Sequence, residues 1–203
     1  MRNLAAALVA IICWAGLAIQ FSNALGNQHH EVGTTLWVLA RFFTVLTNLL
    51  VAVVMTWVAT GRKASPEMLG GVTLAIILVG VVYYELLQGL HHLTGAAQVA
   101  NLLLHRASPI GMTLWWLVFA PRGRLKWSAP LQWVAYPVAY SLYVLGRGQL
   151  DGKYPYPFID VGELGWLQVA LNAGGIALGF ILAGLLLVGI DRWRPLGSNR
   201  ANG

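Results

Sequence analysis

The chain has 203 residues, of which 58% are hydrophobic and only 10% charged, and its mean hydropathy is +0.66. Soluble domains carry about 25% charged residues, so the composition excludes an ordinary soluble protein and predicts an integral membrane protein. The net charge of +6 does not indicate nucleic-acid binding, because the charges stand between apolar segments and act as topology signals. A single cysteine, Cys13, excludes a disulfide framework or a thiolate zinc site, and no cofactor is expected.

Six apolar segments are long enough to cross a bilayer, which requires about 20 residues each. They cover residues 4–23, 36–59, 69–90, 97–119, 129–147 and 163–190. The connections are short and no repeat is present, so the predicted fold is all-α. We expect a single integral membrane domain over residues 1–203, a polytopic bundle of six antiparallel transmembrane helices.

Lys and Arg are distributed unevenly between the connections, and this asymmetry predicts the orientation. Nine of them fall on one side, namely Arg2, Arg62, Lys63, Arg122, Arg124, Lys126, Arg192, Arg194 and Arg200. Only Arg147 and Lys153 fall in the connections on the other side. Cytoplasmic loops carry the excess of positive charge, so both termini are expected in the cytoplasm.

The first segment has a second interpretation as a secretory signal peptide. Arg2 precedes an apolar run, and Ser22-Asn23-Ala24 is a passable cleavage site. Cleavage would leave five spans with an outside start, which fits the charge asymmetry equally well.

Three polar side chains interrupt the second segment: Arg41, Thr44 and Asn48. Their steps of three and four place them on one face of a single helix. Polar and ionisable groups inside a membrane are costly, so they normally face a bundle interior or a wet cavity and mark function. This face is expected to form half of a site.

The other half is predicted from depth. Segment two enters from outside near Leu36 and segment four near Ala97, so Thr44 and His105 each lie about eight residues, or roughly 12 Å, below the outer interface. A threonine hydroxyl and an imidazole can therefore meet. Other polar groups are expected at this level or just above it, namely Asn101 and Ser108 on the face of His105, Glu85 and Gln88 near the outer end of segment three, and Gln168 and Asn172 in segment six.

A hydroxyl beside a histidine is the minimal nucleophile and base for acyl transfer, because an alcohol is a poor nucleophile until a neighbour takes its proton. An imidazole is mostly neutral at cellular pH and can accept that proton. Asn48, Asn101 or Arg41 could orient it or stabilise an oxyanion. The alternative interpretation is purely structural, since a threonine in a membrane helix usually bonds its own backbone and a histidine often joins helices.

Four motifs in order carry a family resemblance. They are F-T-V-L-T-N-L-L-V-A at 43–52, N-L-L-L-H-R-A-S-P at 101–109, F-A-P-R-G-R-L-K-W at 119–127 and Y-P-Y-P-F-I-D at 154–160. With Asn172 in the last span, this order resembles the bacterial branch of the androgen-induced membrane protein family over nearly the whole chain. Animal members of that family are six-pass proteins that hydrolyse fatty-acid esters of hydroxy fatty acids with a threonine and a histidine.

The resemblance implies that Thr44 is the nucleophile and His105 the base. Thr47 is a second candidate, since the spacing after the threonine differs by one residue from the animal pattern, and Ser108 is another alternative nucleophile. The supporting residues are Arg41, Asn48, Asn101, Glu85, Asn172 and Asp160. The expected partners are membrane lipids and a lipid-ester substrate, and the expected location is a bacterial inner membrane.

Two other functions stay open. His29, His30, His91 and His92 lie on the outer side with Glu31 and Glu85 and could make a zinc hydrolase, although ordinary ligand spacing is absent and no metal site is expected. A non-enzymatic protein could bind or transport an anionic lipid through Arg41 and Arg106. Gly175 and Gly179 form a small-xxx-small pair on the last segment, which suits close helix packing or a homodimer.

Overall fold

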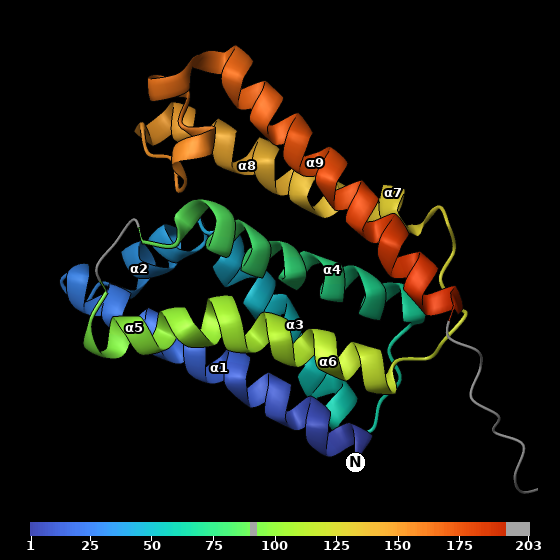
Figure 1. Cartoon of the computed structure of the whole chain (residues 1–203). Coiled ribbons are helices and arrows are strands. Elements are labelled where there is room, and N and C mark those ends of the chain that lie inside the picture. Colours follow the sequence, from blue (N-terminus) through green and yellow to red (C-terminus); the bar gives the residue numbers. More distant parts are fainter. Residues whose placement is uncertain (90–92, 194–203) are drawn as a thin grey trace, which may run out of the picture. The chain divides into compact units, whose positions relative to one another are not determined.

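The computed structural model describes residues 1–89 and 93–193, and over these residues the chain contains helices and no strands. The first half contains α1 (Arg2–Asn27), α2 (Val32–Leu39), α3 (Phe43–Ala59), α4 (Pro66–Val82) and the π-helical turn η1 (Tyr83–Leu87). The second half contains α5 (Gly95–Leu102), the π-helical turn η2 (Leu103–Ala107), α6 (Ser108–Phe119), α7 (Ala129–Trp133), α8 (Ala135–Asp151), the 3-10 turn η3 (Pro157–Ile159) and α9 (Val161–Trp193). Figure 1 labels the nine α-helices of the described residues, α1 to α9.

Several of these helices have the length and apolarity of membrane spans. Within the described residues, Arg2–Asn27, Pro66–Leu87 and Val161–Trp193 meet both conditions, and the bent pair α2–α3 brings the number to four. The helical run from Gly95 to Phe119, which contains Asn101, His105 and Arg106, is not among these candidates. Neither is α8, which has 17 residues. The protein is thus all-helical with three or four candidate membrane-spanning helices; six spans and cytoplasmic termini stay predictions.

The expected single helix over residues 36–59 is wrong. The chain turns by 97° between α2 and α3, because Phe42 is extended (φ −93°, ψ 123°) and α3 begins only at Phe43. Arg41 therefore lies in the break and does not share a helical face with Thr44 and Asn48. No Pro or Gly marks this break in the sequence, so the usual breaker signals do not predict it.

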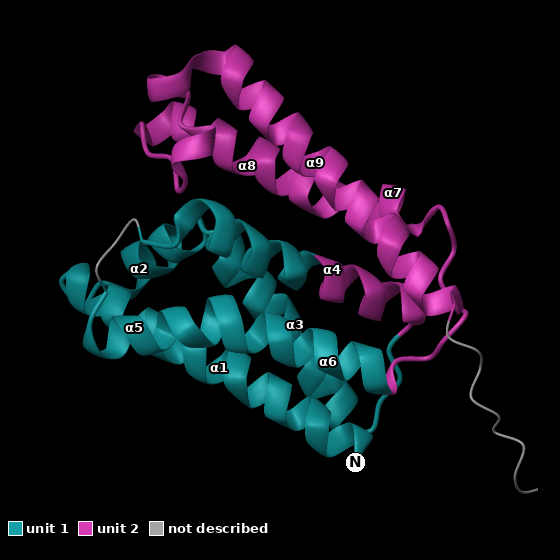
Figure 2. Ribbon diagram, in the orientation of Figure 1, with its two compact units in different colours: residues 1–64, 75–118 teal, residues 65–74, 119–203 magenta. Residues whose placement is uncertain are grey.

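The chain forms two compact units, shown in separate colours in Figure 2. Unit 1 contains residues 1–64 and 75–118, and unit 2 contains residues 65–74 and 119–203, so α4 contributes to both. The single membrane domain remains a prediction.

Unit 1 is built around α1 and α3. The buried residues of α1 are spaced by three and four along one face: Ala6, Val9, Ala10, Cys13 and Gly16. On α3 the buried face includes Thr44, Thr47, Asn48, Val51, Met55 and Val58. This period is that of one helical face, and the two helices pack against each other along it.

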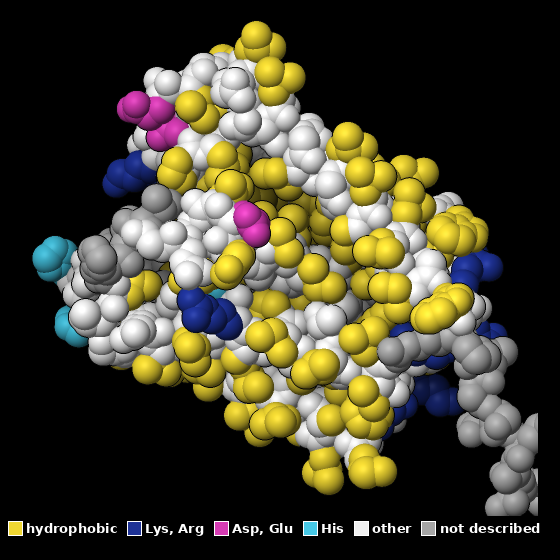
Figure 3. Space-filling view, in the orientation of Figure 1, with side chains coloured by type: hydrophobic (Ala, Val, Ile, Leu, Met, Phe, Trp, Pro, Cys, Tyr) yellow, Lys and Arg dark blue, Asp and Glu magenta, His cyan; other side chains and the backbone are white. Residues whose placement is uncertain are grey.

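The outward faces of the helices are also apolar. Leu4, Leu8 and Ile11 of α1 are exposed, as are Leu171, Leu178 and Leu182 of α9, and Figure 3 shows hydrophobic side chains over much of the visible face. A helix that is hydrophobic on all sides fits a membrane span or the core of a large protein. These faces are compatible with a membrane protein.

In unit 2 the basic loop before α7 is tied to the end of α9. The Asp191 carboxylate accepts hydrogen bonds from the backbone N–H groups of Arg124 and Leu125, both at 3.0 Å. The Arg192 guanidinium donates to the Leu125 carbonyl from Nε at 3.1 Å and from Nη2 at 2.9 Å. The Oδ2 atom of the buried Asp191 thus has its partners in the loop backbone.

Candidate functional site

Thr44 lies in the first turn of α3, and the break before this helix sets what its hydroxyl can bond. Other helical threonines donate to the carbonyl four residues earlier, each at 2.7 Å: Thr35, Thr56, Thr73 and Thr113. The residue four positions before Thr44 is Ala40, which lies before the break at the extended Phe42 and not in α3. The Thr44 Oγ1 atom instead lies 3.2 Å from His105 Nε2, so the predicted contact between these two residues is confirmed.

The other nitrogen of His105 determines the proton positions. His105 Nδ1 lies 3.2 Å from the backbone carbonyl of Asn101. A carbonyl only accepts hydrogen bonds, so Nδ1 carries the hydrogen, and Nε2 of the neutral ring is the acceptor. The Thr44 hydroxyl therefore donates to His105. This is the arrangement in which an imidazole can take a proton from a hydroxyl.

The π-helical turn η2 releases a carbonyl that the site uses. The Ser108 N–H bonds the Leu103 carbonyl, five residues earlier, instead of that of Leu104. The Leu104 carbonyl accepts a hydrogen bond from Asn48 Nδ2 at 3.0 Å and lies 3.1 Å from Ser108 Oγ. Single π turns of this kind are frequent at functional sites.

Asn48 connects the two halves of the cluster and is fully buried, with 0% exposure. Its Nδ2 group donates to the Thr44 carbonyl at 2.9 Å as well as to that of Leu104. Its Oδ1 atom accepts from Ser108 Oγ at 2.6 Å. Asn48 thus orients the backbone beside both Thr44 and His105, and Ser108, whose proton is directed to Asn48, has a positioning role.

Tyr83 completes the cluster and was missed by the sequence interpretation. Its ring centroid lies 4.3 Å from that of His105, and its hydroxyl accepts a hydrogen bond from Asn101 Nδ2 at 2.6 Å. The available signal was its place two residues before Glu85, at the outer end of segment three, where a tyrosine also suits the membrane interface. Tyr83 packs against the imidazole ring of His105. It also fixes the side chain of Asn101, whose backbone carbonyl bonds His105 Nδ1.

Two glycines allow the helices to approach closely enough for these bonds. A Cβ at Gly16 of α1 would lie 2.7 Å from Leu104 Cδ2, beside His105 in sequence. A Cβ at Gly80 of α4 would lie 3.1 Å from Pro109 Cβ and 3.7 Å from the His105 carbonyl. A Cβ at Gly16 would overlap the Leu104 side chain and one at Gly80 would crowd Pro109, so both glycines permit this close packing.

Several predicted site residues lie elsewhere or differ in burial. Glu85 and Arg106 are exposed, whereas Arg41 is 8% exposed, so these three charged side chains do not share one environment. Thr47 is fully buried on α3 at 0% exposure, and Thr44 is 8% exposed. The acceptor nitrogen of His105 faces Thr44, which favours Thr44 over Thr47 as the candidate nucleophile.

Asn172 and Asp160 belong to unit 2 and have local roles there. Asn172 Nδ2 donates to the Phe158 carbonyl at 2.9 Å and supports the 3-10 turn. Asp160 Oδ1 accepts from the Gly162 N–H at 2.9 Å at the start of α9, as a helix-capping side chain does. These contacts give Asn172 and Asp160 structural roles in unit 2.

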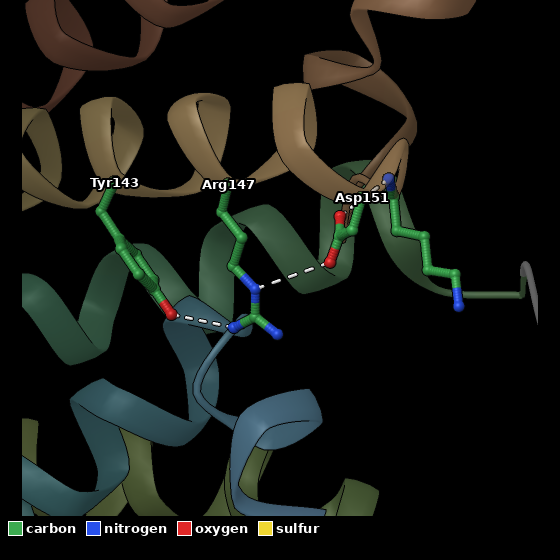
Figure 4. A network of polar contacts seen from close by, with 4 residues as sticks. Tyr143, Arg147 and Asp151 are labelled. Atoms are coloured by element: carbon green, nitrogen blue, oxygen red, sulfur yellow. Dashed lines mark hydrogen bonds and ion pairs between the residues drawn. The ribbon is translucent and has the colours of Figure 1, made fainter. Parts of the chain in front are cut away.

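Arg147 was expected at the end of segment five, but α8 continues to Asp151 and ends at Gly152 in the left-handed conformation (φ 67°). The Arg147 side chain is buried along this last part of the helix. Its guanidinium donates to the Tyr143 hydroxyl at 2.9 Å and lies 3.9 Å from the Asp151 carboxylate, as Figure 4 shows. The spacing of four residues places all three on one face of α8.

The described residues contain no cluster of three or more His, Cys, Asp or Glu side chains suited to hold a metal. His29 and His30 occupy a turn after α1 with positive φ. His91 and His92, which the zinc interpretation also requires, lie outside the described residues.

Comparisons with known proteins identify no relative of the chain. No protein-family model, no curated protein and no solved structure matches the chain.

Proposed function

We propose that the chain is an intramembrane hydrolase of lipid esters in which Thr44 is the nucleophile and His105 the base. The observation that carries the proposal is the 3.2 Å contact between Thr44 Oγ1 and His105 Nε2, with Nδ1 held on the Asn101 carbonyl. The resemblance to the androgen-induced membrane protein family supports the same pair and suggests fatty-acid esters of hydroxy fatty acids as substrates.

The reaction proceeds in two halves. Thr44 Oγ1 attacks the ester carbonyl while its proton moves to His105 Nε2, and the imidazolium then returns that proton to the departing alkoxide as the ester C–O bond breaks. Water attacks the acyl-threonine with His105 again as the base, which releases the fatty acid and restores the Thr44 hydroxyl. The developing oxyanion forms beside the first turn of α3, where the start of the helix carries partial positive charge.

The proposal includes a membrane topology of six spans with both termini in the cytoplasm of a bacterial inner membrane. The uneven distribution of Lys and Arg supports this orientation. Under it, α3 begins within the outer half of the bilayer, so water reaches Thr44 from the outer side and the acyl chains remain among the apolar helices.

The bend between α2 and α3 favours a second candidate, a protein that binds or transports lipids without hydrolysing them. Interrupted helices place helix ends at midmembrane binding sites in many transporters, and here the start of α3 coincides with the polar cluster. In this alternative the Thr44–His105 contact recognises a carboxylate or ester group without forming a covalent bond.

A fluorophosphonate probe distinguishes the two candidates, because it reacts covalently only with an activated hydroxyl. We expect the purified protein to be labelled, Thr44→Ala to lose labelling, and His105→Ala to slow it by about 100-fold or more, the usual contribution of a general base. Thr44→Ser should retain labelling.

The matched control is Thr47→Val, which preserves the volume of the second threonine of α3. It should label like the original protein. An absence of labelling in the folded, intact protein, or equal labelling of Thr44→Ala and Thr47→Val, would exclude Thr44 as a nucleophile and leave the binding protein as the better interpretation.

A further inference from the structure

An open groove runs along unit 1 at the end of α3 opposite to Thr44. Its volume is about 320 Å³, at the lower end of the range for ligand pockets. It is lined by Trp14, Val53, Thr56, Trp57, Thr60 and Arg62. Thr44 and Thr60 lie at opposite ends of α3, so the groove is separate from the proposed catalytic pair.

The walls of the groove present apolar surface because their polar atoms are bonded within the protein. Trp14 Nε1 donates to Thr56 Oγ1 at 3.1 Å, and that hydroxyl donates to the Ala52 carbonyl at 2.7 Å. Trp57 Nε1 donates to the Lys63 carbonyl at 3.2 Å. Both indole rings are nevertheless about half exposed, Trp14 at 44% and Trp57 at 47%. The exposed parts of the two rings thus give the groove an apolar wall.

One end of the groove is cationic. The Arg62 guanidinium carbon lies 4.2 Å from the centroid of the Trp57 ring, a cation–π contact that fixes the side chain. Such stacking uses the flat face of the guanidinium and leaves its edge N–H groups for an oxyanion, in the forked geometry that suits phosphate. Lys63 is exposed next to it and adds a second positive charge.

The groove lies between α1 and the second half of α3. A Cβ at Gly61, next to Arg62, would lie 3.7 Å from Asn3 of α1, so the cationic end is beside the start of that helix. Trp14 and Val53 line the groove further along the two helices. The site therefore combines an anion-binding end with an apolar path between α1 and α3.

We infer that this groove binds one phospholipid of net negative headgroup charge from the surrounding bilayer. An acyl chain lies along α1 and α3 against Trp14, Val53 and Trp57, and the headgroup phosphate is bound by Arg62. Charge complementarity selects this occupant, because a neutral apolar ligand leaves Arg62 unused and a free anion leaves the indole faces unused. Basic pockets between membrane helices on the cytoplasmic side recognise such headgroups. The inference requires the helices to lie in a bilayer, but it does not require Thr44 to be a nucleophile.

The test is native mass spectrometry of the full chain in detergent, titrated with phosphatidylglycerol or with phosphatidylcholine of the same acyl chains. We expect the anionic lipid to bind more tightly than the zwitterionic one, and Arg62→Gln to weaken its binding about fivefold, the contribution of one basic side chain at an anionic surface. Val53→Trp, at an exposed position, fills the apolar path and should weaken both lipids while leaving the charge unchanged.

Arg124→Gln is the matched control, since Arg124 is an exposed arginine from the other basic loop of the same predicted side. It should bind phosphatidylglycerol like the original protein. Equal affinity for the two lipids in the original protein, equal losses in Arg62→Gln and Arg124→Gln, or undiminished binding to Val53→Trp would each overturn the inference. Fluorophosphonate labelling of Arg62→Gln should be unchanged, so failure of the lipid site and failure of the proposed hydrolase are separate outcomes.

Discussion

Asn48 is fully buried and makes three hydrogen bonds. Its partners are the Thr44 carbonyl, the Leu104 carbonyl next to His105, and the Ser108 hydroxyl. A buried amide is costly unless its groups are paired. Here the pairing is complete, because both protons of Nδ2 go to carbonyls and Oδ1 accepts from Ser108. At the scale of the residue, the geometry of the candidate site depends on this side chain more than on any charged group.

Replacement of Asn48 by alanine should destabilise the protein by about 1–3 kcal/mol, the cost of leaving buried polar partners unsatisfied. The measurement is thermal unfolding in detergent, followed by circular dichroism. Thr73→Val is the control, since Thr73 is also fully buried but its hydroxyl bonds only the Leu69 carbonyl of its own helix. If the two variants lose the same stability, Asn48 does not connect the helices as described.

At the scale of the element, irregular helix geometry brings the polar groups together. The start of α3 at Phe43 frees the Thr44 hydroxyl from the backbone, and the π turn η2 frees the Leu104 carbonyl for Asn48. A second π turn, η1, begins at Tyr83, whose ring lies against His105. Regular helices would satisfy their own carbonyls and leave fewer groups for a site.

The contact of α1 with η2 gives a prediction about Gly16. Gly16→Ala should displace Leu104, because the added Cβ would lie 2.7 Å from its Cδ2 atom, and overpacking of this kind costs about 1–3 kcal/mol. We expect a lower unfolding temperature and slower fluorophosphonate labelling.

Gly26→Ala is the matched control in the same helix, because a Cβ at Gly26 would meet nothing within 4 Å. Alanine is a better helix former than glycine, so this variant should be as stable as the original protein or slightly more so. A Gly16→Ala variant that behaves like Gly26→Ala would contradict the tight approach of α1 to η2.

At the scale of the whole molecule, the apolar outer faces and the separation of charge toward the connections agree with a protein that lies in a membrane. The excess of Lys and Arg on one predicted side of the chain predicts its orientation across that membrane. It is a property of the whole chain, since no single loop carries the signal.

The orientation predicts the accessibility of two loops. In a Cys13→Ala background, His30→Cys should react with a membrane-impermeant maleimide in intact cells, because the turn after α1 is expected outside. Lys63→Cys should react only after the membrane is permeabilised. Cys13 is the only cysteine of the chain, so each variant has one reactive thiol, and the opposite pattern of labelling would reverse the topology.

The amino-acid sequence alone was sufficient for the helical class and for the apolar stretches, and it predicted the contact of Thr44 with His105 although the single helix assumed over residues 36–59 is broken at Phe42. These follow from composition, from segment length and from the depth of polar residues along helices of known rise. Depth predicts which residues share a level, and this information is contained in the order of residues.

Only the tertiary structure revealed the break before Phe43, the two π turns, the position of Tyr83 against His105 and the closed hydrogen bonds of Asn48. In η2 the released Leu104 carbonyl is bonded by Asn48 of α3, so this irregularity is compensated by a side chain from another helix. Local propensity describes a helix in isolation, whereas the site exists where neighbouring helices compensate for its interruptions.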